Sequence, residues 1–317
     1  MKLTVAINNY NYGRYVVEAV NSALTQTRLP DEIIVIDDAS TDESRQVLME
    51  EFGQNSLVRL YFKDKNEGQL SCFNLAFEQA TGDVIFFLDA DDVYKENYLE
   101  EIEAYYLGKS QWDFVFCDRE LFGLASGVVS RWGGVSKIGI TRYLTFFGKV
   151  WIGSSTSTVS VRKSLLEKFM PIPLERDWRI RADDCIVWGS SLAGGRKIHH
   201  VKPLIRYRVH DRNGYYKRAM PHGYEEVRSK AVSELFQYFE ERLSLRPVGV
   251  EPIISECWKL PIMNWRYWKI YVWAIRCANV GWAMKFFGIL KITKICFPRL
   301  TGSWIKRFRT KRLHRAA

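Results

Sequence analysis

Two groups of aspartates are the side chains in this sequence best suited to chemistry. The pair Asp37-Asp38 directly follows one apolar run, and the segment Asp89-Ala90-Asp91-Asp92 directly follows another. Carboxylates gathered in one place repel one another unless a cation or hydrogen-bond donors compensate their charge. An Asp-x-Asp pair supplies hard oxygen ligands for Mn²⁺ or Mg²⁺ and leaves coordination positions open for a diphosphate. We therefore expect a divalent cation at the second group.

Two simpler explanations compete with this interpretation. A single acidic group is commonly a helix N-cap or a solvated turn. An EF-hand loop would use Asp89, Asp91 and Glu100 at positions 1, 3 and 12, but it requires a glycine at position 6 and an oxygen ligand at position 5. Tyr94 and Val93 occupy those two positions, so we set the EF-hand aside. The sequence also lacks the Gly-x-Gly-x-x-Gly and P-loop motifs, which disfavours a dinucleotide enzyme or a P-loop NTPase.

The elements that must position these carboxylates alternate along the first 120 residues. Short apolar runs predict β-strands, and the segments between them predict helices. The predicted strands are Leu3–Ile7, Glu32–Ile36, Val58–Phe62 and Val84–Leu88, and the predicted helices are Tyr15–Gln26, Leu70–Ala80 and one that ends near Phe52. Ser40 and Glu43 predict a capping box that opens this last helix. Nearly continuous apolar strands indicate a parallel sheet covered on both faces, so both acidic groups should lie at its carboxyl-terminal edge, where such sheets bind ligands.

The chain resembles the glycosyltransferases of family 2 in a series of short motifs. They occur in the family's order and at close to its spacing, over roughly residues 1–215. The motifs are Val5–Asn11, Ser22–Thr27, Glu32–Asp42, Asn66–Gly68 and Thr81–Asp92. Any one of them is weak, but the ordered set is specific. The resemblance implies an α/β fold of the GT-A type, with a mostly parallel Rossmann-like sheet, and a catalytic domain over 1–215 that uses a nucleotide-sugar donor.

The resemblance also implies roles for residues of the nucleotide-sugar-binding half, 1–120. Tyr10 would stack on the nucleotide base, Asp38 would accept a hydrogen bond from the ring N–H, and Asn8 would contact the donor. Asp89 would lie near the ribose and the metal, and Asp91 would be the main metal ligand. The family usually has Pro-Thr-Tyr-Asn where this chain has Asn8-Asn9-Tyr10-Asn11, so the rigid turn that proline provides at Asn8 is missing.

The acceptor-side half, 121–215, supplies a candidate catalytic base. Arg181-Ala182-Asp183-Asp184 precedes an apolar helical stretch and resembles the family's Glu-Asp site, whose second acid is the base in inverting members. A carboxylate across the sugar from the diphosphate can take the proton of the acceptor hydroxyl. The resemblance gives this role to Asp184, with Asp183 in place of the glutamate. Asp183 could also be a helix N-cap, and both interpretations can hold together.

A second candidate segment lies further along this half. Tyr207-Arg208-Val209-His210-Asp211-Arg212-Asn213 resembles the Tyr-Arg-x-His-x-x-Asn segment that closes many family 2 domains. The resemblance implies that His210 completes the metal shell or contacts the donor diphosphate, and that Arg208 or Arg212 offsets phosphate charge. A histidine in a basic loop is as often structural, so the two interpretations of His210 stay open.

The C-terminal part of the chain differs from the rest in charge. The whole chain has a net charge of +10, but the residues after Glu256 include fourteen Lys and Arg, no acidic residue and six of the eleven tryptophans. We expect residues 216–317 to form a helical extension that lies on an anionic membrane surface without crossing it. The predicted lipid-facing side comprises Trp265, Trp268, Val272, Ile275, Trp282 and Phe286, with added charge from Lys306–Arg312. Alternatively, this face packs on the catalytic domain.

The family resemblance implies a metal-dependent, inverting glycosyltransferase, and we expect it to act in bacterial-type surface polysaccharide or glycolipid synthesis. Its acceptor would be a saccharide or a lipid-linked molecule, and nucleic acid is not expected as a partner. The six widely spaced cysteines and the short first apolar run favour a cytoplasmic protein at the inner face of the membrane. Two alternatives stay open: an inactive relative whose basic tail binds membranes or nucleic acid, and a sugar-nucleotide pyrophosphorylase. The second would need a glycine-rich loop after the first strand, where this chain has one glycine, Gly13.

Overall fold

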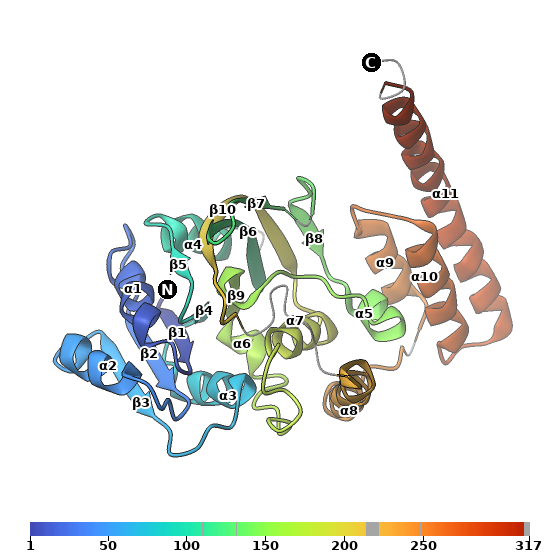
Figure 1. Ribbon diagram of the computed structural model, residues 1–317. Helices are drawn as coiled ribbons and strands as arrows, with labels where there is room; N and C mark the ends of the chain where they lie inside the picture. The colour runs from blue at the N-terminus through green and yellow to red at the C-terminus, as the bar shows by residue number, and fades with distance from the viewer. Residues whose placement is uncertain (110, 131, 214–221, 248, 314–317) are drawn as a thin grey trace.

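The computed structural model describes residues 1–109, 111–130, 132–213, 222–247 and 249–313, with side chains described up to residue 299. The boundary predicted between 215 and 216 and the side chains of Lys306–Arg312 lie outside this description. The first half contains β1 Leu3–Asn9, α1 Gly13–Leu24, β2 Glu32–Asp37, α2 Ser44–Phe52, β3 Val58–Phe62, α3 Gln69–Gln79, β4 Val84–Asp89, β5 Val93–Tyr94 and α4 Tyr98–Leu107. The four predicted strands and the order of strands and helices are confirmed (Figure 1).

The second half completes the sheet and covers it. Its elements are β6 Phe114–Gly123, β7 Gly127–Val129, β8 Lys137–Gly139, α5 Arg142–Gly148, the short 3₁₀ turn η1 Thr156–Thr158, β9 Val159–Arg162, α6 Lys163–Leu166, α7 Asp183–Leu192 and β10 Lys197–Val209. The strand order is β3-β2-β1-β4-β9-β6-β10-β5, with β7 paired to β6 and β8 paired to β10. Strand β9 is antiparallel to both of its neighbours, so β4 and β6 run in the same direction. The predicted α/β fold with a mostly parallel sheet is therefore confirmed.

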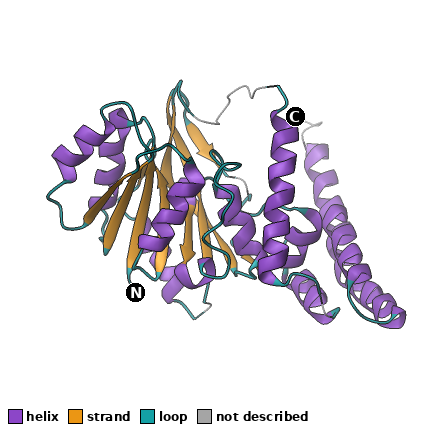
Figure 2. Cartoon of the chain, turned by 90° about the horizontal axis from the view of Figure 1, so that it is seen from below, coloured by secondary structure: helices purple, strands orange, loops and turns teal. Residues whose placement is uncertain are grey.

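Side chains alternate between two cores because successive residues of a strand point to opposite faces. Along β1, Ala6 belongs to one core, whereas Val5 and Ile7 belong to the other. Figure 2 shows helices on both sides of the sheet. Continuous apolar strands thus follow from burial on both faces.

The C-terminal extension consists of α8 Tyr224–Leu243, α9 Glu251–Lys259, α10 Trp265–Cys277 and α11 Trp282–Leu313. Figure 1 places α9, α10 and α11 together at the end of the molecule away from α1 and α2. The buried residues Leu235, Ile253 and Tyr271 belong to the same core as Ala6, so the extension packs onto the catalytic body. No described helix is long and apolar enough to span a membrane.

The predicted capping box of Ser40 and Glu43 is wrong, and the alternative role of Asp183 as an N-cap is not observed. Helix α2 begins at Ser44, with Glu43 at the N-cap and no side-chain cap, so Ser40 and Glu43 do not form a capping box. Asp42 instead accepts hydrogen bonds from the backbone N–H and hydroxyl of Ser44. Helix α7 begins at Asp183, with Ala182 at the N-cap, which places both acids of the predicted pair in the first turn.

Glu256, the last acid of the chain, joins the extension to the body. Its carboxylate accepts hydrogen bonds from the backbone N–H groups of Tyr143 and Leu144 on α5, both at 3.0 Å, and from the Tyr271 hydroxyl on α10 at 3.1 Å. Burial raises the pKa of Glu256 to about 7, although these donors act in the opposite direction. The carboxyl group therefore links α5, α9 and α10 at one buried point.

Glu256 predicts a pH dependence of stability. Because its pKa is higher in the folded protein than in the unfolded chain, the folded state binds the proton more tightly, and stability should fall as pH rises from about 4.5 to about 7. Replacement by Gln should remove roughly 2–4 kcal/mol of this pH dependence. The measurement is the free energy of unfolding of wild type and Glu256→Gln across that range. If the free energies of unfolding of wild type and Glu256→Gln change with pH in parallel, Glu256 does not titrate in this range.

Candidate active site

The ends of three parallel strands bring the predicted donor-side residues to one edge of the sheet. Asn8 of β1 lies opposite Asp89 of β4, and Asn9 lies opposite Asp37 of β2. Tyr10 follows directly and is 44% exposed, so its ring is free to meet a ligand. The Oδ1 atom of Asn8 is buried without a hydrogen-bond partner among the described residues. The expectation that both acidic groups share one edge is confirmed.

The turn after β1 is built without the family's proline. Asn9 Nδ2 donates to Asp37 Oδ2 at 2.8 Å and to Ser40 Oγ at 3.2 Å. Asn11 has a φ of +57°, a region in which Asn is more frequent than most residues, and its Oδ1 accepts from the Thr41 N–H at 2.8 Å. Side-chain hydrogen bonds therefore hold the turn that proline would otherwise stiffen.

Asp38 fixes the loop before α3. Its carboxylate accepts hydrogen bonds from the N–H groups of Glu67 and Gly68 at 3.0 and 2.7 Å and pairs with Lys63 Nζ at 2.8 Å. Gly68 has a φ of +93°, and a Cβ there would lie 2.4 Å from the Cα of Arg179. Asp38 is 3% exposed and already has this structural role. A hydrogen bond to a nucleotide base would be a contact in addition to it.

The second acidic group contains three carboxylates in different surroundings. Asp92 is buried and accepts from Ser157 Oγ at 2.6 Å and from the Arg208 N–H at 2.8 Å. Burial, together with repulsion from Asp91, raises the pKa of Asp89 to about 7. Burial, together with the charges of Asp91 and Asp89, also raises the pKa of Asp92. These aspartates form a crowded acidic site in which Asp92 already has a structural role.

His210 lies beside the main predicted metal ligand. Its Nε2 is 3.0 Å from Asp91 Oδ2, and its ring lies against the rings of Tyr12 and Tyr15, with centroids 5.5 and 4.9 Å away. Asn213 Nδ2 donates to the same Asp91 oxygen at 3.3 Å. The Tyr-Arg-x-His-x-x-Asn segment therefore reaches the Asp-x-Asp pair in space.

The donor set suits a divalent cation shared with a diphosphate. Among the described residues, no three His, Cys, Asp or Glu side chains form a complete metal cluster. Mg²⁺-type ions are commonly held by one or two carboxylates together with water and substrate phosphates. Asp89 and Asp91 can supply these oxygens, and His210 adjoins Asp91. A bound cation would relieve the repulsion that acts on Asp89.

The two acids of the predicted catalytic site, Asp183 and Asp184, lie in distinct environments. Asp184 is 1% exposed and forms ion pairs with Arg181 at 3.0 Å and with Arg228. Asp183 is half-buried and has no ion pair within the described part of the chain. Burial raises the pKa of Asp183, although the nearby charges of Arg181, Arg228 and Arg119 act in the opposite direction. The charge of Asp183 is also one of the smaller causes that raise the pKa of Asp89. Of the two acids, Asp183 is thus the one whose charge acts on the donor-side carboxylate Asp89.

Gln69 connects the donor side of the site to the helix start that bears Asp183 and Asp184. Its Nε2 donates to Asp89 Oδ1 at 2.8 Å, and its Oε1 accepts from the Ala182 N–H at 2.9 Å, directly before Asp183. The sequence interpretation missed Gln69, although it follows the quoted motif Asn66–Gly68. It also missed the hydrogen bonds of Ser157 with Asp92 and of Asn213 with Asp91, although Asn213 ends the quoted segment that contains His210.

Gln69 predicts a catalytic effect that exceeds its effect on folding. Gln69→Leu removes both hydrogen bonds and should lower kcat by about 10–100-fold, the range typical of residues that orient catalytic ligands. The matched control is Gln79→Leu at the other end of α3, where the side chain instead contacts Tyr61 and Arg59. The control should lose stability with little change in kcat. Equal kcat values for the two variants would mean that Gln69 is only structural.

The comparisons with known proteins agree with this geometry. The sequence model described as "Glycosyl transferase family 2" matches residues 4–129. An uncharacterized glycosyltransferase of Nostoc sp. is 31% identical over 291 residues, covering 87% of this chain and 85% of that protein. A putative teichuronic acid biosynthesis glycosyltransferase, TuaG of Bacillus subtilis, is 32% identical over 99 residues, covering 31% of this chain and 39% of that protein.

Solved structures show the same fold at low sequence identity. S. aureus TarS 1–349 in complex with UDP-GlcNAc has a TM-score of 0.53 and 17% identity, covering 95% of this chain and 74% of that chain. The mannosyltransferase PcManGT from Pyrobaculum calidifontis, in complex with GDP-Man and Mn²⁺, has a TM-score of 0.51 and 18% identity, covering 90% and 78%. The fold is therefore of the GT-A type. Together with the extended match to the Nostoc protein, this shows that the chain is a glycosyltransferase and belongs to family 2.

Proposed function

We propose that the enzyme transfers a sugar from a nucleotide-diphosphate sugar to an acceptor hydroxyl, with inversion at the anomeric carbon. The observation that carries the proposal is the direct link through Gln69 between Asp89 and the helix start that bears Asp183. A donor held at the sheet edge would present its sugar toward that acid. The two partners of a displacement reaction would then meet in a fixed geometry.

The donor half of this proposal rests on the sheet edge. Tyr10 would flank the base, Asn8 and Asp38 would contact the nucleoside, and Asp89 and Asp91 would hold Mn²⁺ or Mg²⁺ with His210 beside them. The cation would neutralise negative charge on the diphosphate leaving group. Arg208 donates to the backbone oxygen of Asp91 at 2.9 Å, which holds the Asp-x-Asp segment in place.

The acceptor half rests on the first turn of α7. We assign proton abstraction to Asp183, because its carboxylate is half-buried and without an ion pair among the described residues. Asp184, which the family resemblance favours, is held by Arg181 and Arg228 and would anchor the turn. Arg181 and Arg228 contact the Asp184 carboxylate directly, whereas they act on Asp183 only through its surroundings, so Asp183 is the less engaged of the two acids.

The names of the relatives support a role in the synthesis of bacterial-type surface polysaccharide or glycolipid. TuaG is named for teichuronic acid biosynthesis, and a TarS structure contains UDP-GlcNAc. A saccharide or lipid-linked acceptor is consistent with these names. The structures of TarS and PcManGT carry different nucleotide sugars, so the donor is proposed only as a class.

We further propose that the enzyme works at the inner face of the membrane, to which its C-terminal helices attach. Helix α10 buries Tyr271, Ala274 and Ile275 in the protein, so the predicted lipid-facing side is divided between the core and the surface. Trp265 and Trp282 remain 46% and 82% exposed. Removal of the extension would expose this core, so attachment must be tested in the full chain.

A thermal-shift screen of nucleoside diphosphates, with and without Mn²⁺, tests donor binding. A ligand that binds the folded state at about 100 times its Kd should add about 2.7 kcal/mol of stability. The proposal expects one nucleoside diphosphate to raise Tm in the presence of Mn²⁺. Stabilisation by a nucleoside triphosphate and, separately, by pyrophosphate would instead support a pyrophosphorylase.

A further inference from the structure

The surface of α10 and α11 combines exposed apolar side chains with cations. Soluble monomers seldom leave large contiguous apolar patches uncovered. The exposed apolar residues of these helices are Trp265, Trp273, Trp282, Met284, Phe286, Phe287, Leu290 and Phe297. The sequences of both helices contain Lys and Arg but no Asp or Glu. This surface therefore has the composition of a membrane-facing helix pair.

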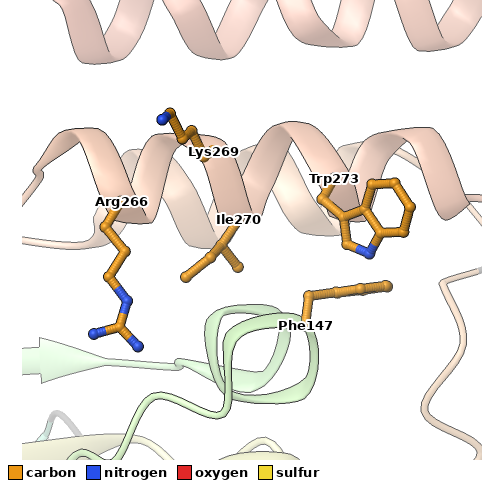
Figure 3. Close-up of a pocket in the computed structure, with 5 residues that line it drawn as sticks. All are labelled: Phe147, Arg266, Lys269, Ile270 and Trp273. Atoms are coloured by element: carbon orange, nitrogen blue, oxygen red, sulfur yellow. The ribbon is translucent and has the colours of Figure 1, made fainter.

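A pocket of about 430 Å³ lies at this surface, between α5 and α10. It is lined by Phe147 of α5 and by Arg266, Lys269, Ile270 and Trp273 of α10. Arg266, Ile270 and Trp273 are spaced as one side of a helix, and Lys269 lies at the edge of that side. In Figure 3, Arg266 and Ile270 point toward α5, the Trp273 ring lies near that of Phe147, and Lys269 projects from the far side of the helix.

The pocket exists because α10 lies close against the end of α5. A Cβ at Gly148 would lie 2.3 Å from Cδ1 of Ile270, so a larger residue there would displace the Ile270 side chain that lines the pocket. Glu256 also joins them, through its bonds to the α5 backbone and to Tyr271. The two walls are thus held by buried contacts, and the pocket is a built feature of the fold.

The cations of the pocket are unpaired within the described part of the chain. Neither Arg266 nor Lys269 has an ion pair or a side-chain hydrogen bond to another described residue. The carboxylate of Glu256 is buried and already accepts three hydrogen bonds. Helix α5 contains no acidic residue either. An anion is therefore the ligand that the pocket would favour.

We propose that this pocket binds the phosphate headgroup of an anionic phospholipid within the bilayer. This inference rests on the membrane attachment proposed above and gives that attachment a specific site. The Arg266 guanidinium, which points toward α5, can bind phosphate oxygens in a forked geometry, and Lys269 adds a second positive charge at the edge of the pocket. Trp273 and Phe147 would lie at the level of the headgroups, where aromatic side chains are enriched.

Occupancy of the pocket would orient the catalytic domain on the bilayer. Helix α10 packs on α5, and α5 packs on α7, whose first turn bears Asp183 and Asp184. A headgroup held by Arg266 on α10 would thus be connected to the proposed base on α7 through α5 alone. This arrangement would present the acceptor side to molecules anchored in the same membrane.

A free phosphate ion or a nucleic acid would satisfy the cations but not the whole surface. Neither ligand accounts for the exposed aliphatic side chains of Met284 and Leu290, which are 54% and 50% exposed. Base stacking uses aromatic side chains, whereas insertion at a bilayer surface also buries aliphatic ones. The surface therefore favours the bilayer, and the other two ligands become outcomes of the test.

The test is co-sedimentation of the full-length protein with vesicles of phosphatidylcholine alone or with added phosphatidylglycerol. Arg266→Gln/Lys269→Gln should weaken binding to the anionic vesicles by about 30-fold, from roughly one kcal/mol per basic residue near an anionic surface. The control Lys2→Gln/Lys202→Gln removes two exposed charges from the sheet and should change binding less than twofold. Both double variants should keep wild-type transfer to a soluble acceptor.

Each result separates the headgroup site from the broader proposals. Equal weakening by the two double variants would overturn the pocket and leave only general charge attraction. Binding of wild type to neither vesicle would overturn the membrane attachment and the pocket with it, while transfer activity would still report on the catalytic proposal. Displacement by inorganic phosphate alone would identify a free-phosphate site. Displacement by a single-stranded oligonucleotide, lost in Arg266→Gln/Lys269→Gln, would identify a nucleic-acid site.

Discussion

Replacement of Asp91 by Asn should lower kcat/KM by about 10²–10³-fold and abolish the effect of Mn²⁺ on donor binding. The amide keeps the shape of the side chain but loses the negative charge that a hard cation prefers. A cation at the leaving group is worth several kcal/mol in the transition state, which corresponds to this range. Calorimetric titration with the nucleoside diphosphate, with and without Mn²⁺, measures the binding part.

Asp92→Asn is the matched control for Asp91→Asn. Asp92 accepts hydrogen bonds from Ser157 and from the backbone of Arg208, so its replacement should lower Tm. The folded fraction of this variant should still bind donor in a Mn²⁺-dependent way. If wild type binds donor equally well without metal, and Asp91→Asn does not change this binding, the Asp-x-Asp pair is not a metal site.

Asp183→Asn should lower kcat by about 10²–10⁴-fold, the usual effect of losing a general base, with little change in donor affinity. The raised pKa of Asp183 means that wild-type kcat should increase with pH as this carboxyl ionises. The variant should lose this rise. The measurement is kcat against pH at saturating donor, with Tm recorded in parallel.

Asp184→Asn distinguishes anchoring from catalysis. Because Asp184 pairs with Arg181 and Arg228 in a buried position, its loss should destabilise the protein by about 3–5 kcal/mol and disturb α7. If Asp184→Asn instead retains its Tm and loses kcat with the wild-type pH profile abolished, Asp184 is the base. In that case Asp183→Asn should remain active, and our assignment of Asp183 is wrong.

The donor edge could be predicted from sequence because strand patterning and motif order are local signals. The apolar runs end where the aspartates begin, and parallel strands bring those ends together, so Asp37 and Asp89 could be placed at one edge. The proximity of His210 to Asp91 depends on the long return of β10, and only the family resemblance suggested it. Family likeness supplied what strand periodicity could not.

The parts that were missed depend on contacts between distant segments. Gln69 bridges Asp89 and Ala182, residues 20 and 113 positions away, and no local pattern marks such a bridge. The environment of Asp184 likewise depends on Arg228 in α8, beyond the resembling region. The sequence predicts one continuous aromatic face from Trp265 to Phe286, but the helix breaks between α10 and α11, and α10 turns Tyr271 into the core.

The most direct measurement of the central claim is nucleotide release from a panel of nucleotide sugars in the presence of Mn²⁺ and candidate acceptors. We expect one donor to yield free nucleoside diphosphate in a reaction that depends on the acceptor. Asp91→Asn and Asp183→Asn should both suppress this release while remaining folded. Release that persists in both folded variants, or exchange of pyrophosphate into nucleoside triphosphate in place of transfer, would contradict this claim.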